Sequence, residues 1–189
     1  MRVNVEINQS QLNRACLLLS TVKCGAAKVT ARAINRTLSG VKTDASAEIR
    51  NEITATKKYV DRTFKIQKAS TVNLRGAVSS TGRPLPLIAF STRKTKKGVS
   101  VLVKKGRTRK VIPHTFIATM KSGHEGVFWR EKVGGKMVGR LKILQRYGPR
   151  VPDIFSNESV MKTVEAKANE RMTKNLSHEI DYELLRSKK

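Results

Sequence analysis

Histidines and carboxylates are the residues in this sequence best suited to hold a metal ion. His114 and His124 are ten residues apart, and Glu125 directly follows the second histidine. The third histidine, His178, falls on a different predicted element. Because a metal site needs three or four converging ligands, this spacing predicts no metal site and favours surface or hydrogen-bonded histidines.

Residue patterns typical of catalysis are also missing from the sequence. A metal-dependent nuclease needs several carboxylates around its ion, but the acids near the predicted sheet are only Asp61, Glu125 and Glu131. No serine lies in a Gly-x-Ser-x-Gly turn, and no lysine has the glycine spacing of a phosphate-binding loop. Cys16 and Cys24 match neither a disulfide framework nor a zinc pattern, so we expect small core residues there. The sequence therefore predicts no catalytic residue and no cofactor, as in a protein that is not an enzyme.

Lysine and arginine give the clearest chemical signal. The chain of 189 residues holds 39 Lys and Arg against 14 Asp and Glu, a formal charge of +25. No acid occurs between Asp61 and Glu125, a stretch that contains 15 Lys or Arg. A solvated surface normally mixes both signs, so this stretch predicts a polyanion nearby. The alternative is a solubility effect, or a positive face that docks on an acidic protein. No apolar run approaches the roughly 20 residues that span a membrane, so no membrane partner is expected.

Two basic runs within this stretch are the candidate nucleic-acid-binding residues. They fall where turn signals predict hairpin turns, and flexible basic loops reach phosphates without reading bases. We expect the two runs to form adjoining hairpin tips that contact DNA by charge rather than by stacking, since few aromatic residues accompany them. Ordinary solvated hairpin tips are the alternative. The nine candidates are Arg93, Lys94, Lys96, Lys97, Lys104, Lys105, Arg107, Arg109 and Lys110.

The N-terminal third of the chain has mainly helical periodicity. Residues 2–8 alternate between apolar and polar side chains, which predicts a short strand. Apolar residues at steps of three and four over residues 27–53 predict one long helix, with Gly40 marking a kink or a close packing contact. Val60 and Phe64 indicate a further short helical stretch.

After residue 70 the pattern changes to the alternation typical of strands. Valine-rich and isoleucine-rich segments separated by turn signals predict an antiparallel sheet of about four to six strands. An amphipathic helix is then predicted over residues 157–186. The order of helices, sheet and helix is that of an α+β protein. We expect a single domain with an N-terminal strand and helices over 1–66, a basic antiparallel β region over 67–152 and a C-terminal helix over 153–189.

Four places in this order carry recognisable motifs. Residues 31–37 contain Ala-Ile-Asn-Arg, and residues 83–88 contain Leu-Pro-Leu-Ile. Residues 113–118 precede a Gly-His-x-Gly-Val-Phe-x-Arg sequence within residues 122–130, and residues 144–152 contain Gly-Pro-x-Val-Pro. Together these motifs resemble the minor tail protein Z family of siphophages and prophages, also called tail-completion proteins. The resemblance covers most of the chain.

The resemblance implies a structural virion protein that is made in the bacterial host cytoplasm and lies at the head-proximal end of a phage tail. Its function would be tail completion, head–tail joining and positioning of the DNA end. Its partners would be other tail and neck proteins, such as the tail tube, tail terminator or head–tail connector. Related tail-end proteins form rings, so we expect a homo-oligomer, a hexameric ring, whose basic tips face the tail lumen or non-specifically bound phage DNA. The alternative function is that of a basic RNA-binding protein of the ribosomal type.

Overall fold

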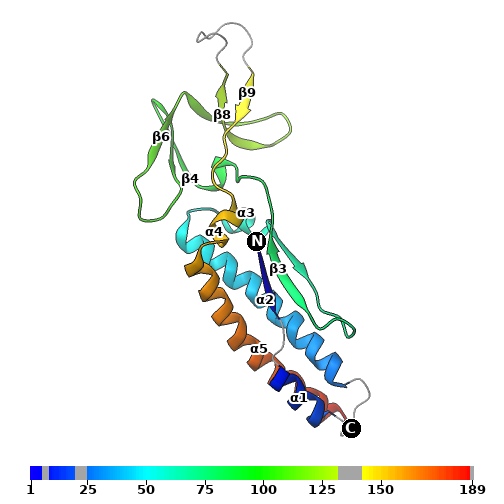
Figure 1. Cartoon of the computed structure of the whole chain (residues 1–189). Coiled ribbons are helices and arrows are strands. Elements are labelled where there is room, and N and C mark those ends of the chain that lie inside the picture. The colour runs from blue at the N-terminus through cyan, green and yellow to red at the C-terminus, as the bar shows by residue number, and fades with distance from the viewer. Residues whose placement is uncertain (6–8, 20–24, 132–141, 188–189) are drawn as a thin grey trace.

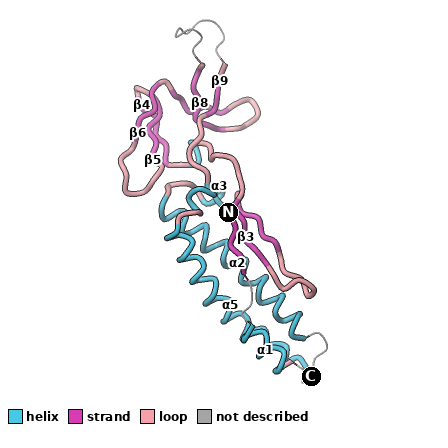
Figure 2. Tube along the Cα trace, in the orientation of Figure 1, coloured by secondary structure: helices cyan, strands magenta, loops and turns pink. Residues whose placement is uncertain are grey.

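The chain folds into an elongated molecule with a helical stalk and a β-rich head (Figure 1). The computed structural model describes residues 1–5, 9–19, 25–131 and 142–187. We use "stalk" for the described residues of 1–82 and 151–187, and "head" for those of 83–150. Figure 2 shows that the long helices lie in the stalk and most of the strands in the head. No helix in the described part of the chain is long and apolar enough to cross a membrane.

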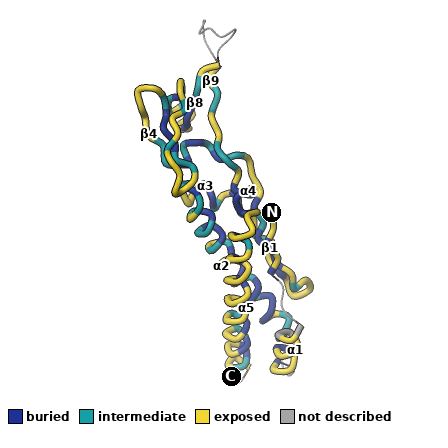
Figure 3. Tube along the Cα trace, turned by 60° about the vertical axis from the view of Figure 1, so that its left-hand side comes forward, coloured by how far each residue is buried: buried dark blue, intermediate teal, exposed yellow. Residues whose placement is uncertain are grey.

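Two long helices form the body of the stalk. Helix α2 (Gly25–Glu52) and helix α5 (Glu158–Ser187) confirm the two long helices predicted from apolar periodicity. They run antiparallel, because Asp44 pairs with Arg171 while Glu48 pairs with Lys167. Their apolar stripes are buried inside one chain, whereas the outer surface of α5 is exposed (Figure 3). Gly40 marks a close packing contact, since the Arg171 side chain occupies the space that a Cβ would need.

A small antiparallel sheet packs against α2. It has the order β1 (Arg2–Val5), β3 (Gly76–Ser80), β2 (Phe64–Gln67). A Cβ at Gly76 would lie 2.6 Å from Leu38 Cδ1 and 2.9 Å from Ile34 Cγ2, so this strand can approach the helix closely because it has glycine there. Helix α1 (Gln9–Leu18) lies at the free end of the stalk (Figure 1).

The expected helical stretch through Val60 and Phe64 is wrong in its second half. Helix α3 (Lys57–Asp61) contains Val60, but Phe64 begins strand β2. The Phe64 ring packs edge-on against Phe155 of helix α4 (Val151–Phe155), with ring centroids 5.5 Å apart. A spacing of four residues fitted a helix, but pairing with β3 and this aromatic contact favour the strand.

The head consists of two further three-stranded sheets. The first has the order β4 (Ser91–Thr95), β5 (Gly98–Leu102), β6 (Lys110–Pro113), and the second has β7 (Thr115–Thr119), β8 (Glu125–Arg130), β9 (Ile143–Gln145). The α+β class is confirmed, although the strands divide among three small antiparallel sheets instead of one larger sheet. His114 stands between β6 and β7 with a φ of 58°, a conformation that turns the chain from one sheet into the next.

Backbone hydrogen bonds join head and stalk at a narrow neck. Thr54, just beyond α2, donates its backbone N–H to Val103 O at 3.0 Å and its hydroxyl to Leu102 O, and its hydroxyl accepts the Ser91 N–H at 3.2 Å. On the other side, the two segments through which the chain enters and leaves the head, one before the short helix η1 (Leu87–Ala89) and one before α4, pair with each other. Gly148 N donates to Leu85 O at 2.7 Å there. Two of the motif segments therefore serve as the joint between the two parts.

Candidate nucleic-acid interface

The first basic run forms the turn between β4 and β5. Thr95 pairs with Gly98, which leaves Lys96 and Lys97 as a two-residue turn that the Thr95 hydroxyl closes by donating to Gly98 O at 2.8 Å. Gly98 has a φ of 150°, and a Cβ there would collide with the carbonyl oxygen of Ile112, so glycine is required. We name residues 93–97 the β4–β5 tip, and all four of its Lys and Arg side chains are exposed.

The second basic run forms the connection between β5 and β6, which we name the β5–β6 loop (residues 103–109). Lys104, Lys105 and Arg107 are exposed, and so is Lys110 at the start of β6. The loop backbone is attached to the end of α2, because Lys105 N donates to Glu52 O at 2.9 Å. Its basic side chains therefore extend from a fixed backbone.

Arg109 differs from the other eight candidates. Its guanidinium donates to Ser91 O at 3.1 Å and also to the Ser91 hydroxyl, and the residue is half-buried. This arginine ties the β5–β6 loop to β4. Its donors are already engaged, so it is less suited to reach a phosphate than its exposed neighbours are.

The expectation that the two runs form adjoining tips is wrong. Strands β4, β5 and β6 form two consecutive hairpins that share β5. The first turn precedes Gly98 and the second follows Leu102, so the two basic runs lie at opposite ends of β5. A strand rises about 3.4 Å per residue, so the five residues of β5 separate the two turns by roughly 15 Å. The head thus carries two distinct basic surfaces.

The charges of the head are unpaired within the described chain. None of the nine candidate side chains has an ion-pair partner among the described residues. Glu125 and Glu131 are the two acids of residues 83–150. Unpaired, exposed cations of one sign produce a positive field that attracts a polyanion.

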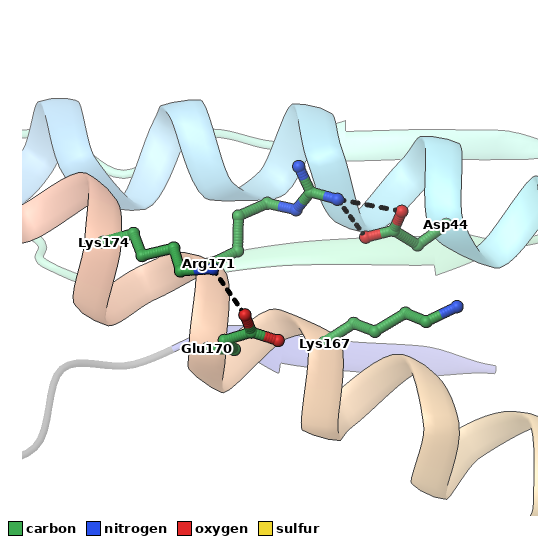
Figure 4. Close-up of a pocket in the computed structure, with 5 residues that line it drawn as sticks. All are labelled: Asp44, Lys167, Glu170, Arg171 and Lys174. Atoms are coloured by element: carbon green, nitrogen blue, oxygen red, sulfur yellow. Dashed lines mark hydrogen bonds and ion pairs between the residues drawn. The ribbon is translucent and has the colours of Figure 1, made fainter.

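In the stalk, by contrast, charged side chains of α2 and α5 form ion pairs with one another. A pocket of about 290 Å³ between α2 and α5 is lined by Asp44, Lys167, Glu170, Arg171 and Lys174 (Figure 4). Arg171 binds both Asp44 oxygens, at 2.8 and 3.0 Å, and Lys174 pairs with Glu170 at 2.5 Å. Arg171–Asp44 and the neighbouring Lys167–Glu48 pair form a ladder of ion pairs that joins the two helices, whereas Lys174–Glu170 is a pair within α5.

The pKa of Glu48 reflects the same ladder. The Lys167 ammonium donates to the Glu48 carboxylate at 2.5 Å, and this hydrogen bond holds the pKa of Glu48 below its ordinary value of 4.5 despite partial burial. The carboxylate therefore favours its charged form in the folded chain.

The histidines and Cys16 occupy separate places. His124 lies edge-on to Phe128, with ring centroids 6.3 Å apart, and His178 Nδ1 lies 3.3 Å from an Arg36 nitrogen. Among the described residues, no group of three or more His, Cys, Asp or Glu could hold a metal ion. Cys16 is exposed, so the expected core position is wrong for it, because Ala15 of α1 and Leu19, which directly follows the helix, are the buried residues there. Cys24 lies outside the described residues.

Sequence reasoning missed the role of Asn35 in the Ala-Ile-Asn-Arg motif. Its amide donates to Ala69 O at 2.9 Å and accepts the Ala69 N–H at 2.8 Å, which fixes the chain after β2 onto α2. Its neighbour Ile34 is fully buried, and Arg36 pairs with Glu179 at 3.5 Å. An amide beside the apolar stripe of a helix is the signal that could have indicated such a clamp.

Comparison with known proteins gives one result that covers nearly the whole chain. The family model of prophage minor tail protein Z matches residues 11–189. The chain is thus a structural protein of a phage tail. It belongs to the prophage minor tail protein Z family, which confirms the resemblance seen in the sequence motifs. Comparison with curated proteins and with solved structures gives no significant match.

Proposed function

We propose that this tail protein works at the head-proximal end of the tail, where it helps to complete the tail, joins it to the head and positions the DNA end. One observation carries the proposal. The head presents exposed basic side chains without an internal partner among the described residues, and packaged DNA is the polyanion that the joined head and tail of a phage share. Family membership supports the assignment to the tail, and the charge supports the contact with DNA.

The contact with DNA uses charge without base recognition. Lys and Arg that neutralise phosphates release condensed counterions, so affinity falls with salt and does not depend on sequence. The β4–β5 tip supplies Arg93, Lys94, Lys96 and Lys97 to this contact. At the opposite end of the sheet, Lys104, Lys105, Arg107 and Lys110 add to the positive field of the head. Arg109 contributes by holding the loop on Ser91.

We further propose that copies assemble into a hexameric ring next to other tail and neck proteins. The stripes of α2 and α5 do not supply the contact between subunits, because they are buried within one chain. Large apolar side chains remain exposed on α1 and near the C-terminal end of α5: Leu17, Leu18, Tyr182 and Leu185. These side chains support an interface at the free end of the stalk. Particle reconstruction tests this arrangement, and a single copy away from the tail axis would contradict it.

The experiment for DNA contact compares two double variants of equal charge change. Lys94→Gln/Lys96→Gln removes two cations from the tip, and Lys162→Gln/Lys174→Gln removes two from exposed positions of α5. The slope of log affinity for duplex DNA against log salt should become less negative in the tip variant, by about 0.9 for each phosphate contact that is removed. The α5 control should keep the slope. Equal slopes in all three proteins would overturn the assignment of DNA contact to the β4–β5 tip.

The same tip variant separates two roles in the phage. If the tip meets DNA, particles assemble with joined heads and tails but deliver DNA poorly. If the tip instead docks on an acidic ring protein, heads and tails remain separate. Electron microscopy counts the joined particles, and a titre counts the infectious ones. Separate heads and tails would contradict the proposed contact of the tip with DNA.

A further inference from the structure

A groove of about 410 Å³ lies between η1 and the face of the β4–β5–β6 sheet. Its floor is aliphatic and its rim is basic, with no acid among its lining residues. The floor is formed by Leu87, Val101, Val103 and Ile112, and the rim by Lys104, Arg107, Thr108 and Lys110. The groove therefore combines two chemistries that the β4–β5 tip does not combine, since the charged residues of that tip surround a solvent-exposed turn.

The groove is held in shape by contacts that do not involve its rim side chains. On one side, the backbone of the β5–β6 loop bonds to the end of α2 through Lys105 N and Glu52 O. On the other side, Arg109 fixes the loop to Ser91. Leu87 and Val101 are 5% and 3% exposed, so the back of the groove is continuous with the core. A ligand would meet a formed site and would not have to order a loose loop.

The lining favours a peptide over a nucleic acid. The apolar floor offers nothing to phosphates, and no aromatic ring lines the groove for a base to stack on. Aliphatic side chains of a peptide would instead be buried on this floor. Carboxylates flanking them would meet Lys104, Arg107 and Lys110, which have no ion-pair partner among the described residues.

We propose that this groove binds an acidic peptide segment carrying aliphatic side chains, supplied by a neighbouring protein of the virion. The occupant is identified by complementarity of both charge and apolar surface. This proposal goes beyond contact with DNA and does not require it. It assigns the two ends of one sheet to two partners, DNA at the β4–β5 tip and a protein segment at the β5–β6 loop.

Fluorescence anisotropy of the full chain tests the proposal with three labelled probes: a Glu-Leu repeat hexapeptide, a Glu-Ser repeat hexapeptide and duplex DNA. The groove variant is Lys104→Gln/Arg107→Gln, and the matched control is Lys94→Gln/Lys96→Gln. We expect the Glu-Leu peptide to bind at least tenfold more tightly than the Glu-Ser peptide. The groove variant should lose this binding, while the control should retain it.

Three results would overturn the proposal. Equal binding of both peptides would show charge attraction alone, and no binding of either would show that the groove is not a peptide site. A groove variant that weakens DNA binding but not Glu-Leu binding would assign the loop to nucleic acid. Failure of the DNA probe to bind at all would contradict only the function proposed above. Unchanged thermal melting of both variants verifies that their exposed substitutions leave the fold intact.

Discussion

Stalk and head differ in whether their charged side chains form ion pairs within the chain. Residues 83–150 contain 18 Lys and Arg against two Asp and Glu, whereas the rest of the chain contains 21 against 12. In the stalk, acids pair with bases across α2 and α5, as in Asp44–Arg171 and Glu48–Lys167. In the head, none of the candidate cations has an ion-pair partner among the described residues. Charge joins α2 to α5 in the stalk, whereas the candidate cations of the head remain available to other molecules.

The two regions also differ in how they are stabilised. The stalk buries a continuous apolar stripe along two helices of 28 and 30 residues. The head has short strands of three to six residues, with a few buried side chains such as Val99 and Val127. The neck joins them through specific hydrogen bonds. We therefore expect substitutions in the stalk core to cost the most stability and substitutions of head charges to cost the least.

The largest effect is expected in the stalk core. Ile49 is fully buried, so Ile49→Ala leaves a cavity and should cost about 2–5 kcal/mol in free energy of unfolding. Val72→Ala, at a side chain 96% exposed, serves as the control and should change little. Chemical denaturation of the isolated protein measures both. An unchanged midpoint for Ile49→Ala would mean that this stripe serves a neighbouring subunit instead.

A smaller effect is expected at the neck. Thr54→Val keeps the side-chain shape but leaves Ser91 N–H without its acceptor, which should cost about 1–3 kcal/mol. If the neck holds the head in place while head and stalk unfold separately, hydrogen exchange should accelerate in β4 and β5 and not in α2. Thr43→Val is the control, because that exposed hydroxyl donates only within α2. Faster exchange throughout the molecule would show that head and stalk unfold as one unit and would weaken the comparison.

The sequence was sufficient for the helices because their signal is local. Ile34, Leu38 and Ile49 repeat at the helical period within one segment, and this stripe predicted both the long helix and its buried face. Sheet pairing depends on residues far apart in sequence and had no such signal. Arg2 pairs with Ser79, for example, across most of the N-terminal half of the chain. Phe64 was misassigned for the same reason, because its contact with Phe155 could not be seen from the helical spacing.

The sequence identified the basic residues of the candidate site but did not lead us to their arrangement in space. A run of basic residues is visible in any sequence, and eight of the nine candidates are exposed. Their separation follows from consecutive antiparallel hairpins, whose turns alternate between the two ends of a sheet, so the hairpin order alone was enough to predict it. The groove was not predictable, since it depends on where η1 places Leu87 against Val101 and Ile112.

The ion-pair ladder of the stalk should show its contribution in a pH series. The pKa of Glu48 is lowered in the folded chain by Lys167, so its stabilising effect is present above the ordinary value of 4.5 and is lost as pH falls through the lower folded value. The wild type should therefore lose stability in acid more steeply than Glu48→Gln does. The measurement is the denaturation midpoint of both proteins at a series of pH values from above 4.5 downward. Parallel curves for the two proteins would show that the pair contributes nothing to folding.

The smallest effect on stability is expected at the β4–β5 tip, and it completes the comparison. Lys94 and Lys96 are exposed and lie in an acid-poor region, so Lys94→Gln/Lys96→Gln should change the free energy of unfolding by no more than about 0.5 kcal/mol. At low salt the change should be stabilising, because removing two like charges relieves repulsion within the head. Added salt should remove this gain by screening. Denaturation at two ionic strengths measures both terms. A clear loss of stability at low salt would mean that these lysines have partners inside the chain, and the distinction between internally paired stalk charges and externally directed head charges would then fail.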